Sequence, residues 1–374
     1  MKIRKIVFLM FWLLLSALIF VAVNFALSFF FTKELTTQTP KNPDFYIGDL
    51  NRLGTTSIGI TRKNIYSLKR HIQLKDYNGQ RIDMITIGDS VSNGIGNQFY
   101  QDSIADNFNF TVLNIPPFGS EIKDVKDLYS IETIIKLANS GYLDEIQPKY
   151  ILIQSNERYA QNRFSKDYDF TQTAKIEDIK KAYNGVDLTK LTDFVKVYFQ
   201  KGYFFINKDN FNYLKNITQL KLFPDKPLNN QVLVRDLSKP LFSTYNHNDK
   251  ILFFVEDTEY ASQIDKKKLE KLNNNFNELA ALLKKHNIEL IFMPTVDKTT
   301  LYRDYVKGEK YPQSMFFPYM REFKKEYIFI DTDKILKGSL ENGEKDVFWP
   351  NDTHWTQKAG QIIFSKENKE KFSF

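Results

Sequence analysis

Hydrophobic and polar residues follow one another in short blocks along the chain, and these blocks predict strands and helices. Apolar runs bounded by Gly, Asp, Asn or Pro predict buried strands at 82–89, 110–119, 150–156, 251–255, 288–294 and 327–332. Apolar residues at helical spacing predict helices over 121–139 and from Leu269 to Leu283, and a last helix through Ala359 and Ile363. Because strands alternate with helices, we expect an α/β fold with a parallel sheet covered on both faces.

The N-terminal block differs from the rest. Residues 6–31 form an apolar run that exceeds the roughly 20 residues needed to cross a bilayer. Lys2, Arg4 and Lys5 precede this run, so the positive-inside rule places residues 1–5 in the cytoplasm and the remainder outside. A cleaved signal peptide is the alternative, but its apolar region would be shorter, and no convincing small-x-small cleavage site follows. We therefore predict a single-pass signal anchor at 6–31 and an extracytoplasmic location for the rest of the chain.

The pattern also predicts how the chain beyond the anchor is divided. Residues 32–80 are polar and include a stretch rich in Thr, Lys and Pro, which is typical of a stalk or pre-domain segment. The regular α/β pattern runs over 81–374 and predicts one domain. Within it, residues 164–250 are rich in Asn, Lys and Pro and have looser periodicity, which indicates an insertion or cap.

Composition and charge exclude several classes of function. The 374 residues are 42% hydrophobic and 15% aromatic, which allows a large core and argues against disorder. The net charge of +7 is dispersed, without the basic stripe that nucleic-acid binding requires. The chain has no Cys, so disulfides, a thiolate nucleophile and Cys-bound metals are excluded. No His-rich or acidic cluster has metal-ligand spacing, and we expect neither a metal nor a cofactor.

Residues of types that serve in catalysis or binding follow several of the predicted strands. Ser90 follows the first strand, Gly119 the second and Asn156 the third, while Asp352 and His354 precede the last helix. Because ligands bind at the carboxyl ends of strands in open α/β sheets, we expect these residues to lie near one another.

These residue types suit nucleophilic acyl chemistry. A serine hydroxyl needs a base, and His354 is a base suited to neutral pH that Asp352 can orient. The Ser90 amide, the Gly119 amide and the Asn156 side chain are the available oxyanion donors. The other histidines fit less well: His71 is in the polar pre-domain segment, His247 is in the insertion, and His286 closes a predicted helix.

Each residue also has an ordinary structural explanation. Gly-Asp-Ser at Ser90 and Asp-Thr at Asp352 are both helix N-cap patterns, and Gly119 and Asn156 suit turns. Glu157 and Arg158 can form a surface ion pair of little energetic value. Lys298 and Tyr302 follow a strand, but a surface lysine and a half-buried tyrosine are expected there, outside the site. The joint occurrence of the five candidates at strand ends favours the catalytic interpretation.

The motifs and their order resemble those of the SGNH (GDSL-type) hydrolase superfamily. The resemblance rests on "GDSVSNG" around Ser90, on Gly119, on Asn156 and on the C-terminal Asp-x-His, over residues 82–366 apart from the insertion. It implies a three-layer α/β/α, flavodoxin-like fold with a triad of Ser90, His354 and Asp352 and an oxyanion hole of Ser90, Gly119 and Asn156. "QSNER", "FMPTVDKTTLYRDY" and "DTHW" resemble the branch that contains alginate-type and other cell-surface polysaccharide O-acetyltransferases.

The resemblance implies a membrane-anchored extracytoplasmic serine O-acyltransferase that acetylates a cell-surface polysaccharide through an acyl-Ser90 intermediate. Acetyl-CoA is cytoplasmic, so we expect a membrane-bound O-acyltransferase partner that delivers acyl groups. Two alternatives remain. With water as the acceptor, the same triad would make a carbohydrate esterase or deacetylase. Without catalysis, the chain would be a polysaccharide-binding or scaffolding protein on the same fold.

Overall fold

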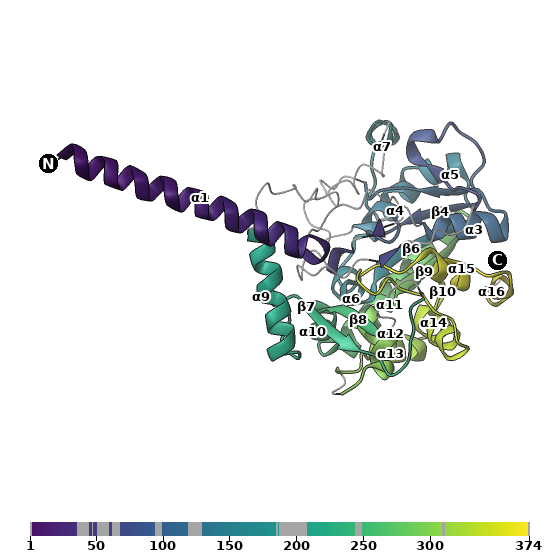
Figure 1. Cartoon of the computed structure of the whole chain (residues 1–374). Coiled ribbons are helices and arrows are strands. Elements are labelled where there is room, and N and C mark those ends of the chain that lie inside the picture. The colour runs from purple at the N-terminus through teal and green to yellow at the C-terminus, as the bar shows by residue number, and fades with distance from the viewer. Residues whose placement is uncertain are drawn as a thin grey trace.

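The computed structural model describes residues 2–35, 45–46, 48–50, 60–61, 68–93, 99–118, 129–184, 186, 208–243, 249–308 and 311–372. Helix α1 (Lys2–Leu35) extends away from an α/β domain (Figure 1). Within α1, residues Arg4–Leu27 are long and apolar enough to cross a membrane, with a mean hydropathy of 2.9. This length and composition fit a membrane anchor and a signal sequence alike.

The domain is built on a parallel sheet, as predicted, and this sheet has six strands. Its order is β10-β9-β6-β4-β5-β3. This is the flavodoxin-like order with one strand added at the edge, and the order reverses between β4 and β6. The strands are β3 (Ile72–Gln73), β4 (Met84–Ile87), β5 (Val112–Asn114), β6 (Tyr150–Asn156), β9 (Glu289–Thr295) and β10 (Ile328–Phe329).

Two groups of helices flank the sheet. In the first group, α11 (Lys266–Lys284) contacts α4 (Ser130–Asn139), α6 (Glu157–Phe164) and α13 (Phe316–Glu322). In the second, α15 (Gln357–Ile363) contacts α3 (Tyr100–Phe108) and α14 (Thr332–Glu341). The apolar residues that predicted α11 are all buried, because their spacing places them on the face toward the sheet: Leu269, Leu272, Phe276, Leu279 and Leu283. The shorter helices are η1 (Leu74–Asp76), α5 (Tyr142–Ile146), α7 (Ile176–Tyr183), α10 (Val255–Ala261), α12 (Lys298–Tyr302), η4 (Arg303–Tyr305) and α16 (Lys366–Lys371).

One predicted strand lies outside the main sheet. β8 (Lys250–Phe254) pairs antiparallel with β7 (Val232–Asp236) in a separate two-stranded sheet. Its alternate side chains enter different clusters: Ile251 and Phe253 join the main core, and Leu252 joins a small cluster beside it. Because both faces of β8 are buried, its sequence has the continuous apolar run that is typical of a central parallel strand.

Parts of the predicted stalk and pre-domain segment pack on the domain. β3 pairs with β5 and extends the main sheet by one strand. Leu50 is buried in the small cluster with Leu252. A further pair, β1 (Phe45–Tyr46) and β2 (Ile60–Thr61), is antiparallel. Segments of two or three residues are too short to show a hydrophobic period, so the sequence pattern does not reveal them.

The described parts of the predicted insertion, residues 164–250, divide between the two clusters. Ile179 and Tyr183 of α7 are buried in the main core. Helix α9 (Lys208–Leu222) packs Leu220 against the small cluster, which contains Val232 of β7. Figure 1 shows α9 at the edge of the domain from which α1 projects.

Candidate active site

Ser90 lies in a tight turn after β4. The turn begins at Gly88, where an added Cβ would lie 2.3 Å from Ser92 Oγ and 2.5 Å from Gln154 Oε1, so a side chain does not fit. The Ser92 and Asn93 amides donate to the Asp89 carbonyl at 3.0 and 3.1 Å, which closes the turn. Ser90 is half-buried at the carboxyl edge of the sheet, beside the position where the strand order reverses.

The structure brings Ser90, His354 and Asp352 together. His354 Nε2 is 2.9 Å from Ser90 Oγ, and His354 Nδ1 is 2.6 Å from Asp352 Oδ1. The same Asp352 oxygen accepts the His354 backbone amide at 2.9 Å, so the spacing of two residues holds both groups in one loop. With the Nδ1 proton directed at Asp352, Nε2 accepts the hydroxyl proton of Ser90, which is the arrangement that a general base requires.

A second carboxylate, that of Asp49, supports this loop. The Asp49 amide donates to Asp352 Oδ2 at 3.0 Å, and the Thr353 amide donates to Asp49 Oδ1 at 2.8 Å. Asp49 Oδ2 lies 3.7 Å from His354 Nδ1 and accepts the Thr353 hydroxyl. At Gly48, an added Cβ would lie 2.0 Å from the Asn351 carbonyl oxygen, so glycine permits this close approach.

The electrostatics of the loop favour a strong base. Burial lowers the pKa of His354, but the charge and hydrogen bond of Asp352, together with the charge of Asp49, outweigh it. The pKa of His354 therefore lies above its ordinary value. Burial and repulsion from Asp352 raise the pKa of Asp49. The two carboxylates therefore stabilise the imidazolium that would form when Ser90 loses its proton.

Lys298 holds the loop from beneath. It is 1% exposed, and its Nζ donates to the carbonyl oxygens of Pro350 and Asp352 at 2.9 and 3.0 Å. Burial lowers its pKa to about 7, against the attraction of Asp352, Asp49 and Asp257. Lys298 was expected at the surface but is a buried hydrogen-bond donor. Tyr302 was expected to be half-buried but is fully buried. Its hydroxyl accepts the Phe348 amide at 3.3 Å, ahead of the same loop.

Asn156, the predicted oxyanion donor, ends β6 next to the Ser90 turn. Its backbone amide donates to Asp89 Oδ2 at 2.8 Å, which ties the ends of β6 and β4 together. The side chain makes no capping hydrogen bond to α6. Gly119, the other predicted donor, lies outside the described residues.

The buried Asp89–Arg163 pair fixes the nucleophile turn. Arg163 Nη1 donates to Asp89 Oδ2 at 2.8 Å and to Ser155 Oγ at 2.7 Å. Burial raises the pKa of Asp89, but the charge and hydrogen bonds of Arg163 and the Asn156 amide outweigh it, so the pKa lies below its usual value. Asp89 therefore remains ionised and holds the turn from below.

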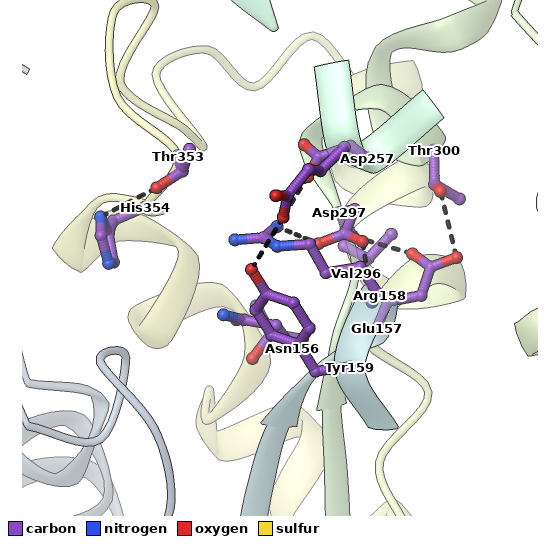
Figure 2. Close-up of polar contacts among 12 residues, drawn as sticks. Asn156, Glu157, Arg158, Tyr159, Asp257, Val296, Asp297, Thr300, Thr353 and His354 are labelled. Atoms are coloured by element: carbon purple, nitrogen blue, oxygen red, sulfur yellow. Dashed lines mark hydrogen bonds and ion pairs between the residues drawn. The ribbon is translucent and has the colours of Figure 1, made fainter. Parts of the chain in front are cut away.

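Glu157 and Arg158 do not form the surface ion pair that their sequence suggests. Both are buried, and Arg158 Nη1 instead donates to Asp257 at 2.9 Å and Asp297 at 2.6 Å (Figure 2). Glu157 accepts the Asp297 amide at 2.8 Å and the Thr300 hydroxyl at 3.1 Å. Burial raises the pKa of Glu157 to about 7. The contacts brace the end of β6 against the end of β9.

The register of the sheet explains this cross-brace. Asn156 of β6 lies opposite Thr295 of β9, so the residues after each strand meet across the sheet edge. Asp297 accepts the Arg158 amide at 2.9 Å, while its own amide donates to Glu157. In the sequence, the polar stretch after each predicted strand is the only sign of these contacts. A single sequence does not reveal which strands are neighbours, so it does not predict which polar residues meet.

The remaining described histidines have other partners. Nδ1 of the buried His71 lies 2.6 Å from Asp102, and its Nε2 lies 2.5 Å from Gln73 Nε2. His286 follows α11 and places its Nδ1 2.7 Å from Asp144. His247 lies outside the described residues. Among the described histidines, only His354 is recorded in contact with Ser90.

Asp49, Asp352 and His354 also form a group whose ligand atoms lie within 4.8 Å of one another. The carboxylate oxygens in this group accept protein donors: the Asp49 and His354 amides for Asp352, and Thr353 for Asp49. A bound cation would compete with these N–H donors and with the Nδ1 proton of His354. The donor set therefore fits a hydrogen-bonded Ser–His–Asp arrangement better than a metal centre.

The parallel sheet in flavodoxin-like order, with Ser90, His354 and Asp352 at its carboxyl edge, is consistent with an SGNH hydrolase-like fold. The family model described as "SGNH hydrolase-like domain, acetyltransferase AlgX" matches residues 248–363. That range contains His354 and Asp352 and confirms the resemblance to the alginate-type acetyltransferase branch. No curated protein and no solved structure matches the chain.

Proposed function

We propose that the protein is a membrane-anchored, extracytoplasmic serine O-acetyltransferase that modifies a cell-surface polysaccharide. The observation that carries this proposal is the contact of Ser90 Oγ with His354 Nε2 at 2.9 Å, with Nδ1 2.6 Å from Asp352. The match of residues 248–363 to an acetyltransferase-type SGNH domain favours acyl transfer over hydrolysis. The apolar helix α1, whose residues Arg4–Leu27 are long enough to cross a membrane, would supply the anchor.

The reaction would proceed in two half-reactions. In the first, His354 Nε2 takes the Ser90 hydroxyl proton while Ser90 Oγ attacks the acyl carbonyl of a donor. The Asn156 amide and the Ser90 backbone amide would stabilise the oxyanion, together with Gly119 as the resemblance implies. The bond to the donor's leaving group then breaks, the leaving group takes the proton from His354, and acyl-Ser90 remains.

In the second half-reaction, His354 would take the proton of a sugar hydroxyl, whose oxygen attacks acyl-Ser90. Collapse of the tetrahedral intermediate releases the O-acetylated sugar and returns the proton to Ser90. Acetyl-CoA is confined to the cytoplasm, so the acyl donor must cross the membrane. A membrane-bound O-acyltransferase is therefore the proposed partner, and the α1 anchor would keep the catalytic domain close to it.

The first test is whether Ser90 becomes acetylated. The detergent-solubilised full chain is incubated with p-nitrophenyl acetate and examined by intact-mass and peptide-mapping mass spectrometry. We expect one acetyl adduct on Ser90. We expect none in Ser90→Ala or His354→Ala, with ester turnover reduced by at least ~10⁴-fold. Ser262→Ala, at an exposed serine after α10, is the matched control and should react like the wild type. An adduct that persists in Ser90→Ala, or no adduct and no turnover in a folded wild-type chain, contradicts the proposal.

The second arm separates transfer from hydrolysis. The acetyl adduct is isolated and its decay is followed in buffer alone and with a methyl glycoside or a short oligosaccharide. A transferase should lose its adduct faster with the sugar and form an acetylated glycoside. An adduct that decays at the same rate in both, with acetate as the only product, identifies an esterase.

A further inference from the structure

Helix α9 exposes an apolar stripe. Outside α1, the large hydrophobic residues that are exposed in the described part of the chain are Tyr129, Phe211, Leu214, Leu222 and Phe223. Four of these five lie in α9 or directly after it, with exposed fractions of 47% to 67%. Phe211, Leu214 and Leu222 are separated by three and eight residues, which places them on one face of the helix.

The opposite face of α9 is attached to the domain. Asn216 is fully buried, and Leu220 packs against the cluster of Leu50, Leu228, Val232 and Leu252. Gln219 Nε2 donates to the Pro227 carbonyl at 3.1 Å, which ties the helix to the strand that follows. The orientation of the exposed stripe is therefore fixed by packing on the other side.

Exposed lysines border the apolar stripe. Lys215 and Lys221 lie on the outer part of α9, and Lys226 follows it with its ammonium 4.7 Å from the centre of the Phe223 ring. An exposed helix with aromatic and leucine side chains flanked by lysines is typical of a segment that lies in the headgroup region of a membrane. The lysines are complementary to the anionic lipid headgroups that such a face would meet.

The position of α9 agrees with that environment. Figure 1 shows α9 at the margin of the domain, on the side from which α1 projects. If α1 crosses the bilayer, the surface of the domain nearest the membrane is the one that carries α9. The occupant of the apolar stripe is then the membrane itself.

We propose that α9 is a membrane-surface helix, whose exposed stripe of Phe211, Leu214, Leu222 and Phe223 inserts among anionic lipid headgroups. This rests on the proposed anchoring by α1 and goes beyond the proposed reaction. With α1 and α9 both attached, the domain would have two contacts with the bilayer. The carboxyl edge with Ser90 would then be held in one orientation relative to the membrane, within reach of an acyl donor delivered there.

The absence of cysteine gives a direct test. Leu222→Cys and Phe211→Cys variants of the full chain are labelled with an environment-sensitive fluorophore and reconstituted into protein-free vesicles of phosphatidylcholine and phosphatidylglycerol. Lys324→Cys is the control, because the side chain of Lys324 is 90% exposed. This residue follows α13, away from α9. Quenching is measured with lipids that carry a nitroxide on the upper acyl chain, and separately with iodide in water.

We expect the α9 labels to be quenched by lipid nitroxide several-fold more than the Lys324→Cys label, and to be shielded from iodide. Replacing Lys215, Lys221 and Lys226 with Gln should reduce this quenching, as should vesicles of phosphatidylcholine alone. Equal lipid quenching at all three positions overturns the proposal, because pure lipid vesicles contain no other partner for the stripe. Shielding from iodide without lipid quenching also overturns it, since a second copy of the chain would then cover the helix. The acetylation of Ser90 is measured separately, so the two proposals fail independently.

Discussion

At the scale of single residues, the imidazole of His354 lies between carboxylates from distant parts of the chain. Asp352 is its partner at Nδ1, and Asp49 lies 3.7 Å from the same nitrogen. Both carboxylates favour the protonated imidazole and outweigh the effect of burial, so the pKa of His354 is raised. The basicity of the proposed general base is thus set partly by a residue outside the predicted catalytic domain.

This arrangement predicts a pH effect for Asp49→Asn. A general base acts in its neutral form, so kcat/KM falls as the pH drops through the pKa of His354. Removing the Asp49 charge lowers that pKa, and the acid limb of the kcat/KM profile for p-nitrophenyl acetate should move to lower pH. Asp167→Asn removes an exposed charge that is paired with Lys271, and its profile should match the wild type. An acid limb that stays in place or moves to higher pH would show that Asp49 does not tune His354.

At the scale of elements, the predictable features are those with a period or an order. The spacing of Leu269 to Leu283 predicted α11, and the positions of Ser90, Asn156 and His354 at strand or loop ends predicted which residues meet. The sequence does not predict which strands pair or in which register. The contact between Arg158 and Asp297 depends on the register of β6 and β9, so it was not predicted. For the same reason, β8 was expected in the main sheet although it pairs with β7.

The docking of residues 48–50 on the catalytic loop can be tested through Gly48. In Gly48→Ala, the new methyl group would meet the Asn351 backbone at 2.0 Å, so the segment or the loop must move. We expect ester turnover to fall by about 10- to 100-fold. The free energy of unfolding, measured with urea, should fall by about 1–3 kcal/mol.

The matched control is Gly338→Ala in α14, where nothing lies within 4 Å of an added Cβ. There alanine is a better helix former than glycine, so stability should rise by about 0.5–1 kcal/mol with turnover unchanged. If both variants behave alike, close packing at Gly48 does not hold the loop.

At the scale of the whole molecule, the chain combines an apolar helix with a domain whose site lies at the carboxyl edge of its sheet. Beneath that edge is a layer of buried ionisable side chains, formed by Asp89, Arg163, Arg158, Asp297 and Lys298. Buried charges need partners, and here their hydrogen bonds link the ends of β4, β6 and β9 to the His354 loop. If α1 anchors the chain as proposed, the position of this edge relative to the membrane would determine which substrates can reach it.

The proposed topology can be tested with two single-cysteine variants, because the natural sequence has no cysteine background. In spheroplasts, a membrane-impermeant maleimide should label Lys324→Cys in the domain. It should label Lys2→Cys only after the membrane is permeabilised, because the positive-inside rule places that end in the cytoplasm. The opposite labelling pattern would place the domain inside the cell and contradict an extracytoplasmic acyltransferase.

The contacts of Asp49 also determine how the protein can be shortened for biochemistry. A soluble fragment that starts at residue 81, where the α/β pattern becomes regular, would lack β3 and the Asp49 amide that donates to Asp352. Such a fragment would lose an edge strand and a support of the histidine loop while it kept Ser90, Asp352 and His354. If such a fragment were inactive, the cause would be the missing N-terminal residues and not the absence of a catalytic triad. Soluble fragments should therefore begin between α1 and Gly48.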